Sequence, residues 1–88
     1  GMTNEYVRVL QEFLSFIHQT YPNIPDVSAT GYFGPITRNA VAAFQRQFGI
    51  NPTGSVGAET WNAISDVYYG LRYGYHKKPG QYPGYTIT

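Results

Sequence analysis

The chain has 88 residues, with six Lys and Arg against five Asp and Glu, nine tyrosines and no cysteine. This length predicts one small domain, stabilised by packing rather than by disulfides or a thiolate metal site. The net charge is +1 and the basic residues are scattered, which argues against the clustered basic face of a nucleic-acid-binding protein. No apolar run is long enough to predict membrane insertion. A surface poor in charge and rich in tyrosine suits a neutral ligand.

The first helix is predicted over residues 6–17. Thr3 or Asn4 is expected to cap its start, with Glu5 in the first turn. His18 is expected to cap the other end. The core face shows helical spacing and consists of Val7, Leu10, Phe13, Leu14 and Ile17.

Two prolines interrupt the helical pattern that follows, so residues 21–30 are predicted to form an ordered surface loop, fixed to the core by Ile24 and Val27. A second helix is predicted over residues 35–48, because proline is favoured at the first helical position. Gly49 is expected to end it. The predicted core face of this helix is Ile36, Ala40, Val41, Phe44 and Phe48.

A third helix is predicted over residues 58–69, with Gly70 as its end. The residues expected in its core face are Trp61, Ile64 and either Val67 or Tyr68.

Composition divides the chain into a lead-in of residues 1–5, a domain of residues 6–70 and a tail of residues 71–88. The tail is rich in Tyr, Gly and Pro and has no periodicity, which is typical of an irregular tail or a linker between repeats. The lead-in lacks the basic and apolar regions of a signal peptide. Gly1 before Met2 is expected to be a remnant of expression.

A short motif occurs twice, at residues 31–41 and 54–64, with Gly, Gly, Thr, Asn and Ala matching in register. The first glycines, Gly31 and Gly54, are expected to take positive φ in tight turns. Both copies are therefore expected to build the same turn and to start a helix.

The other matched residues are also assigned to the scaffold. Gly34 and Gly57 are expected to allow close backbone approach before each helix. The hydroxyls of Thr37 and Thr60 are expected to bond free backbone groups in the first helical turn. Further scaffold roles are expected for Phe33 and Val56 as core plugs, for Ala40 and Ala63 in helix packing, and for Gln11 and Gln45 in satisfying buried backbone groups.

Four motifs in order together resemble the peptidoglycan-binding-like domain family, over about residues 6–69. Thr30 stands where many relatives carry Asp before the first glycine of the turn. The motifs are Val-x-x-Leu-Gln at residues 7–11, Gly-x-Phe-Gly-x-x-Thr at 31–37, Ala-Val-x-x-Phe-Gln at 40–45 and Thr-Gly-x-Val-Gly-x-x-Thr-Trp at 53–61.

The resemblance implies an all-α fold, a compact three-helix bundle that does no chemistry and binds bacterial peptidoglycan through its glycan or its stem peptide. It also implies an extracytoplasmic, cell-wall-associated location. A linked catalytic domain or further copies of the module are the implied partners. The alternative is a structural or protein–protein interaction module on the same scaffold, because fold alone does not fix function.

No catalytic, metal or cofactor site is expected. A glycosidase needs two carboxyl groups about 5 to 9.5 Å apart across a sugar. His18 and His76 form no pair at metal-ligand spacing. The acids are expected to be solvated surface carboxylates: Glu5, Glu12, Asp26, Glu59 and Asp66.

The candidate ligand contacts lie at the two turns. Tyr32 sits between the glycines of the first turn, where an outward ring can stack on a sugar. Arg38 follows on the second helix, where it can meet a stem-peptide carboxylate. Asn39 and Asn62 occupy matched positions and either line a shallow groove between the helix starts or bond the neighbouring turn.

Overall fold

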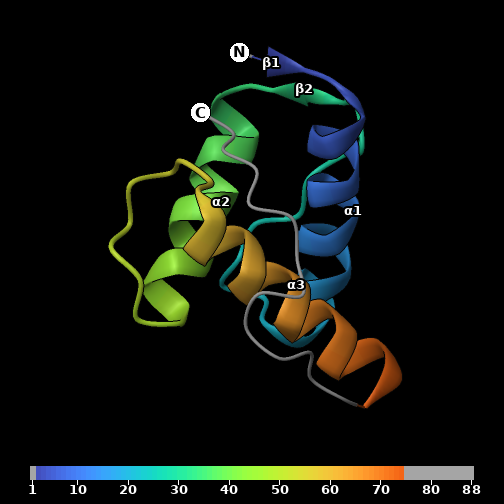
Figure 1. The fold of residues 1–88 in the computed structure, drawn as a ribbon, viewed down its shortest axis with the longest axis vertical. Coiled ribbons are helices and arrows are strands. Elements are labelled where there is room, and N and C mark those ends of the chain that lie inside the picture. Colours follow the sequence, from blue (N-terminus) through green and yellow to red (C-terminus); the bar gives the residue numbers. More distant parts are fainter. Residues whose placement is uncertain (1, 75–88) are drawn as a thin grey trace.

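A computed structural model describes residues 2–74 of the chain. Figure 1 shows three helices, with a short strand before each of the first two. The strands pair antiparallel, with Met2 opposite Phe33, beside the starts of the first two helices. The predicted all-α, three-helix fold is confirmed. Its elements are β1 Met2–Thr3, α1 Glu5–Thr20, β2 Tyr32–Phe33, α2 Pro35–Gln47 and α3 Ala58–Tyr73.

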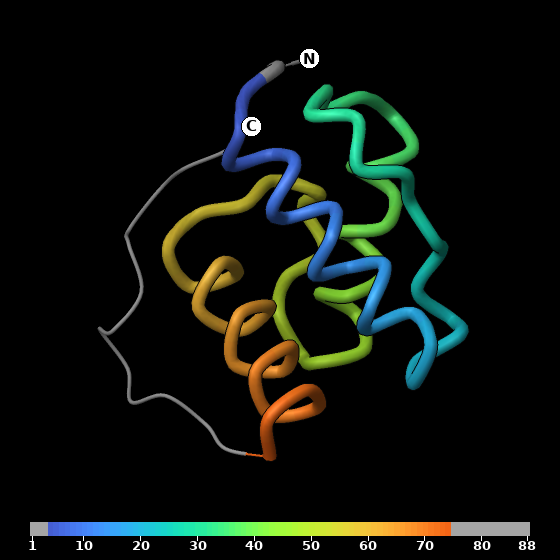
Figure 2. Tube along the Cα trace, turned by 90° about the vertical axis from the view of Figure 1, so that its right-hand side faces the viewer, coloured from blue at the N-terminus to red at the C-terminus, as the bar shows by residue number. Residues whose placement is uncertain are grey.

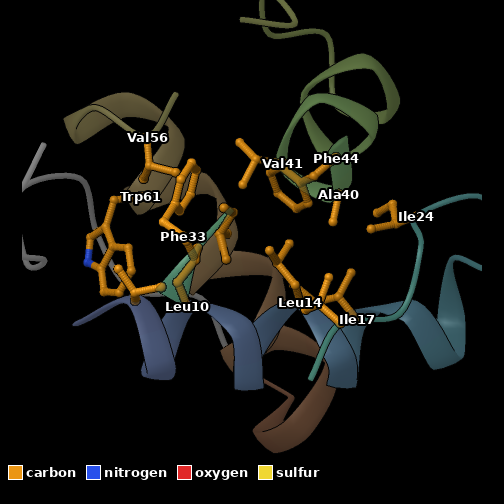
Figure 3. Close-up of a cluster of buried hydrophobic side chains, with 13 residues drawn as sticks. Leu10, Leu14, Ile17, Ile24, Phe33, Ala40, Val41, Phe44, Val56 and Trp61 are labelled. Carbon is orange, nitrogen blue, oxygen red and sulfur yellow. The ribbon is translucent and has the colours of Figure 1, made fainter. Parts of the chain in front are cut away.

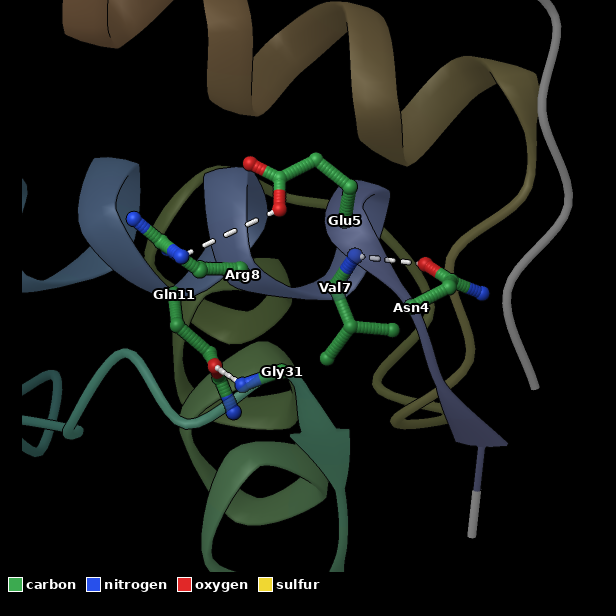
Figure 4. Close-up of polar contacts among 6 residues, drawn as sticks. All are labelled: Asn4, Glu5, Val7, Arg8, Gln11 and Gly31. Atoms are coloured by element: carbon green, nitrogen blue, oxygen red, sulfur yellow. Dashed lines mark hydrogen bonds and ion pairs between the residues drawn. The ribbon is translucent and has the colours of Figure 1, made fainter.

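Helix α1 begins where its predicted cap lies. The Oδ1 atom of Asn4 accepts a hydrogen bond from the Val7 N–H at 2.9 Å (Figure 4), which satisfies one of the free donors of the first turn. The Asn4 N–H in turn donates to the carbonyl oxygen of Gly31 at 2.9 Å. The start of α1 is therefore tied to the first of the two repeated turns.

The segment after α1 is an ordered loop, as predicted. Because a carbonyl oxygen can only accept, His18 Nδ1 donates to the Ile24 oxygen, at 2.6 Å. Ile24 and Val27 are both buried. The Ser15 hydroxyl donates to Asp26 Oδ1 at 2.7 Å. Two polar bonds and two buried side chains thus hold this loop along α1 (Figure 2).

Helix α2 starts with Pro35 at its first position and ends through a glycine. Gly49 has φ +74°, and the Ile50 N–H donates back to the Gln45 carbonyl oxygen at 2.8 Å. This pattern is a Schellman cap. The predicted stop at Gly49 is confirmed.

Helix α3 runs further than predicted, because Gly70 stays helical and Gly74, at φ +76°, provides the left-handed cap. The predicted end at Gly70 is wrong. Packing against α1 continues into the extra turn: beyond the rings of Phe13 and Tyr68, whose centroids lie 4.0 Å apart, the Arg72 guanidinium lies 5.7 Å from the ring centroid of Phe16. Residues 71–73 therefore belong to the helix, and the remainder of the predicted tail, from residue 75, lies outside the described residues.

The core lies between the three helices, with contributions from both turns and from the loop (Figure 3). The predicted burial of Phe33, Val56 and Trp61 is confirmed. Ile36, however, is 70% exposed, so its predicted place in the core is wrong. The core-facing position in the first turn of α2 belongs instead to Thr37, because that polar residue meets a buried glutamine. The buried apolar residues are Val7, Leu10, Leu14, Ile17, Ile24, Val27, Phe33, Ala40, Val41, Phe44, Val56, Trp61 and Ile64.

Candidate functional site

A buried glutamine of α1 holds the first repeated turn. Gln11 Oε1 accepts a hydrogen bond from the Gly31 N–H at 2.8 Å (Figure 4), and Gln11 Nε2 donates to the Tyr32 carbonyl oxygen at 2.9 Å. The same amide nitrogen lies 3.0 Å from the Thr37 hydroxyl oxygen. One side chain therefore joins α1, the turn and the first turn of α2.

A second glutamine repeats this arrangement between α2 and α3. Gln45 Oε1 accepts from the Gly54 N–H at 2.9 Å, and Gln45 Nε2 donates to the Ser55 carbonyl oxygen at 3.0 Å and to the Thr60 hydroxyl at 3.1 Å. Gln45 is 1% exposed, as is Gln11. The two copies of the motif thus build the same turn, held in the same way.

These contacts test the roles expected for the repeated residues. Gln11 and Gln45 do satisfy buried backbone groups, as predicted, and Gly31 and Gly54 have φ of +82° and +79°. The hydroxyls of the two matched threonines accept from the glutamine amides and not, as expected, from the free backbone of the helix start. A different threonine bonds backbone: the Thr30 hydroxyl accepts from the Tyr32 N–H of the first turn at 3.1 Å.

The two turns differ in the space before their helices. A Cβ atom added to Gly34 would lie 2.5 Å from Cε2 of Tyr32, so the tyrosine ring lies directly over this glycine. The matched Gly57 has nothing within 4 Å of that position, because Ser55 replaces the tyrosine. What approaches Gly34 closely is therefore a side-chain ring and not, as expected, backbone, and nothing approaches Gly57.

A groove of about 400 Å³ lies beside the first turn. Its walls come from α1, the loop, the turn and the start of α2. The loop wall has no counterpart in the second connection, since Gln11 and Gly31 are 20 residues apart whereas Gln45 and Gly54 are 9 apart. The lining residues are Gln11, Asp26, Val27, Ser28, Thr30, Tyr32, Gly34, Pro35, Ile36 and Thr37.

Several groups in the groove remain available to a ligand. Tyr32 is 50% exposed, and the exposed Ile36 side chain adds apolar surface. Gly34 caps α2 without a side-chain bond, and no bond within residues 2–74 uses the N–H groups of Ile36 and Thr37. Asp26 uses Oδ1 for both of its hydrogen bonds, to Ser15 and to the Val27 N–H, and leaves Oδ2 open. The groove therefore offers a ring face, two amide donors and one carboxylate.

Of the four candidate contact residues, only Tyr32 lines this groove. Arg38 lies elsewhere, its guanidinium 5.4 Å from the Phe33 ring centroid and its Cγ against Gly54. Asn39 is exposed, and Asn62 is half-buried on α3 with an Oδ1 atom that has no hydrogen-bond partner among the described residues. Neither amide bonds the neighbouring turn within the described part of the chain. The four residues are not brought together at one place.

Residues 2–74 contain no cluster of three or more potential metal ligands among His, Cys, Asp and Glu. Four of the five acids are exposed, as expected, but Asp66 is half-buried on α3. Glu5 lies 4.0 Å from Arg8 in an exposed pair (Figure 4). His76 lies outside the described residues. None of the described helices has both the length and the apolar character needed to cross a bilayer.

Two groove residues, Asp26 and Ile36, do not follow from the sequence pattern. That pattern predicts a solvated surface for Asp26 and a core position for Ile36, and the structure places both in the groove wall. The length of the proline-containing loop, residues 21–30, is a signal in the sequence that could have indicated the groove. A long ordered connection beside a helix start can form a wall that a short one cannot.

Comparison with known proteins identifies the family of the chain. The family model described as "Putative peptidoglycan binding domain" matches residues 3–64, which include both turns and both glutamines. No curated protein and no solved structure matches the chain significantly. The family match covers well over half of the 88 residues. The chain therefore belongs to the family of peptidoglycan-binding domains.

Proposed function

We propose that the chain is a non-catalytic module that binds peptidoglycan through the groove beside its first turn and so anchors a parent protein at the cell wall. The parent is a wall hydrolase or a protein with several copies of the module. Family membership supports the ligand class. The observation that carries the proposal is the groove itself, with the half-exposed Tyr32 ring in its wall.

The chemistry of the groove matches that of peptidoglycan. Sugar rings have apolar faces that stack on aromatic side chains, and Tyr32 supplies such a face. N-acetyl groups and stem peptides carry amide carbonyl oxygens. The free N–H groups of Ile36 and Thr37 at the start of α2 are suitable donors for them. Apolar contacts with Ile36 and Pro35 complete the fit.

The other lining groups act as scaffold. The Gln11 side chain forms hydrogen bonds with the Thr37 hydroxyl and with the backbone of the turn. Both side chains are nearly fully buried. A ligand therefore meets a preformed wall, so little ordering is needed on binding. The groove is partly open to solvent, which fits weak binding by one copy and useful retention when copies or domains are linked.

Co-sedimentation with purified, insoluble peptidoglycan tests this function. The 88-residue chain and a chain carrying two linked copies are compared, with a peptidoglycan-free tube as the blank. We expect the linked copies to be retained much more strongly, since the second contact becomes intramolecular. Retention of neither protein would exclude the proposal and favour the structural or interaction module.

A further inference from the structure

The charge of the groove is set by one residue. Among the described residues that line it, Asp26 alone is charged, and none is Lys, Arg or His. Arg38, the basic residue of the first copy of the motif, is held over the Phe33 ring and against Gly54. Within residues 2–74 the carboxylate of Asp26 has no ion-pair partner, since the one salt bridge there joins Arg8 and Glu5. The groove is thus anionic at the loop wall.

Asp26 is also held in place. Its Oδ1 atom accepts from the Ser15 hydroxyl at 2.7 Å and from its neighbour's backbone, Val27 N–H, at 2.9 Å. Val27 is buried, which fixes the loop behind the carboxylate. These bonds restrain the side chain and leave Oδ2 open, so less rotamer freedom is lost when a cation binds. A fixed carboxylate beside an apolar groove suits an ammonium group on a short aliphatic stem.

We infer that the groove recognises the stem peptide of peptidoglycan through a free amine, with Asp26 as the residue that pairs with the ammonium. This inference rests on the proposed function and specifies its ligand. The diamino acid of a stem peptide keeps a free side-chain amine wherever that peptide is not cross-linked. Its aliphatic stem can lie on Ile36 while the peptide carbonyl oxygens face the start of α2. The module therefore selects stem peptides whose side-chain amine has not been acylated by a cross-link.

The test is a backbone-amide NMR titration of the full chain with two probes. One is a free stem tripeptide that ends in lysine, and the other is the same peptide acetylated on the side-chain amine. We expect the free peptide to bind about threefold more tightly, the scale of an exposed ion pair, with the largest shifts at the unbonded amides of Ile36 and Thr37. Equal affinities, or no shifts with either peptide, would overturn the inference.

Two variants test whether Asp26 causes the preference for the peptide with the free amine. Asp26→Asn keeps an acceptor for Ser15 and for the Val27 N–H, so the loop is retained. It is expected to bind both peptides equally. Glu59→Gln removes the same charge at an exposed site that does not line the groove, and is expected to keep the threefold preference. A preference that persists in Asp26→Asn would overturn the inference.

A third probe and a wall assay distinguish a stem-peptide amine from a glycan amine. A glucosamine tetrasaccharide presents amines on a glycan, and an Asp26-dependent preference for it over the peptide would overturn the stem-peptide inference. Peptidoglycan whose free amines have been acetylated is expected to retain the linked copies less well. Equal retention on intact and acetylated wall would overturn the inference and leave the proposed function standing, whereas no retention on either would exclude both.

Discussion

The Gln11 side chain accepts a hydrogen bond from the Gly31 N–H at 2.8 Å, and this bond fixes the turn from which the groove is built. The same side chain donates to the Tyr32 carbonyl oxygen, so the residue that presents the aromatic ring is held through its backbone. Gln45 and Gly54 repeat the bond at 2.9 Å in a turn without that ring. The chain thus contains two equal scaffolds and places a groove beside the first.

Removing either glutamine is expected to destabilise the fold. Gln11→Leu and Gln45→Leu each leave a buried N–H and a buried hydroxyl without a partner, which costs about 2 to 4 kcal/mol of unfolding free energy. Urea unfolding followed by circular dichroism measures this change. The exposed Gln47→Leu is the matched control and is expected to stay within about 0.5 kcal/mol of the wild type. A similar small effect at Gln11 would contradict the role of the buried network.

Alanine substitutions at the two N-cap glycines, Gly34 and Gly57, test whether the position of the Tyr32 ring matters for binding. Gly34→Ala brings a methyl group into the space of the Tyr32 ring and is expected to displace that half-exposed ring and to lower retention on peptidoglycan. Gly57→Ala meets nothing within 4 Å and is expected to leave retention unchanged. Both variants share the modest cost of alanine at an N-cap, about 1 kcal/mol at most. Equal retention of the two would show that the ring position is unimportant.

Substitution of Arg38 distinguishes a binding site confined to the groove from one that includes Arg38. Its guanidinium packs over the Phe33 ring, so Arg38→Ala is expected to cost about 0.5 to 1 kcal/mol of stability. Because Arg38 lies outside the groove, retention on peptidoglycan is expected to be unchanged. Co-sedimentation below the thermal transition measures this. A fall in retention would instead support a contact between Arg38 and a stem-peptide carboxylate.

Much of the fold follows from local sequence signals. Asn4 caps α1, Pro35 begins α2 and Gly49 ends it, because these positions favour a side-chain acceptor, a residue that needs no N–H partner and a positive φ, respectively. The end of α3 does not follow in this way. Gly70 and Gly74 are both plausible stops, and the turn beyond Gly70 carries Arg72, whose guanidinium packs over Phe16 of α1, a contact that only the tertiary structure creates.

The candidate site is less predictable than the fold. Tyr32 can be proposed from the sequence because it lies between two glycines and Phe33 already fills the core. Asp26 cannot, since its place in the groove depends on how the loop packs along α1. Ile36 has helical spacing with the core residues but lies at the first turn, where Thr37 faces the buried glutamine instead. Helical periodicity identifies the face of α2 that turns toward the core. It does not show that the first turn of that face, at Ile36, is exposed to solvent.

The central claim, that the first turn binds peptidoglycan, is tested most directly by the substitution Tyr32→Ser in the chain with two linked copies. This change gives the first turn the residue of the second turn, Ser55, and removes a half-exposed ring without opening the core. Stacking on an aromatic side chain contributes about 0.5 to 1.5 kcal/mol, so each copy loses binding severalfold and linking multiplies the loss. We predict strong retention of the unchanged protein on purified peptidoglycan and little retention of the variant, with the same helical circular dichroism. Equal retention of the two proteins would contradict a binding role for the first turn.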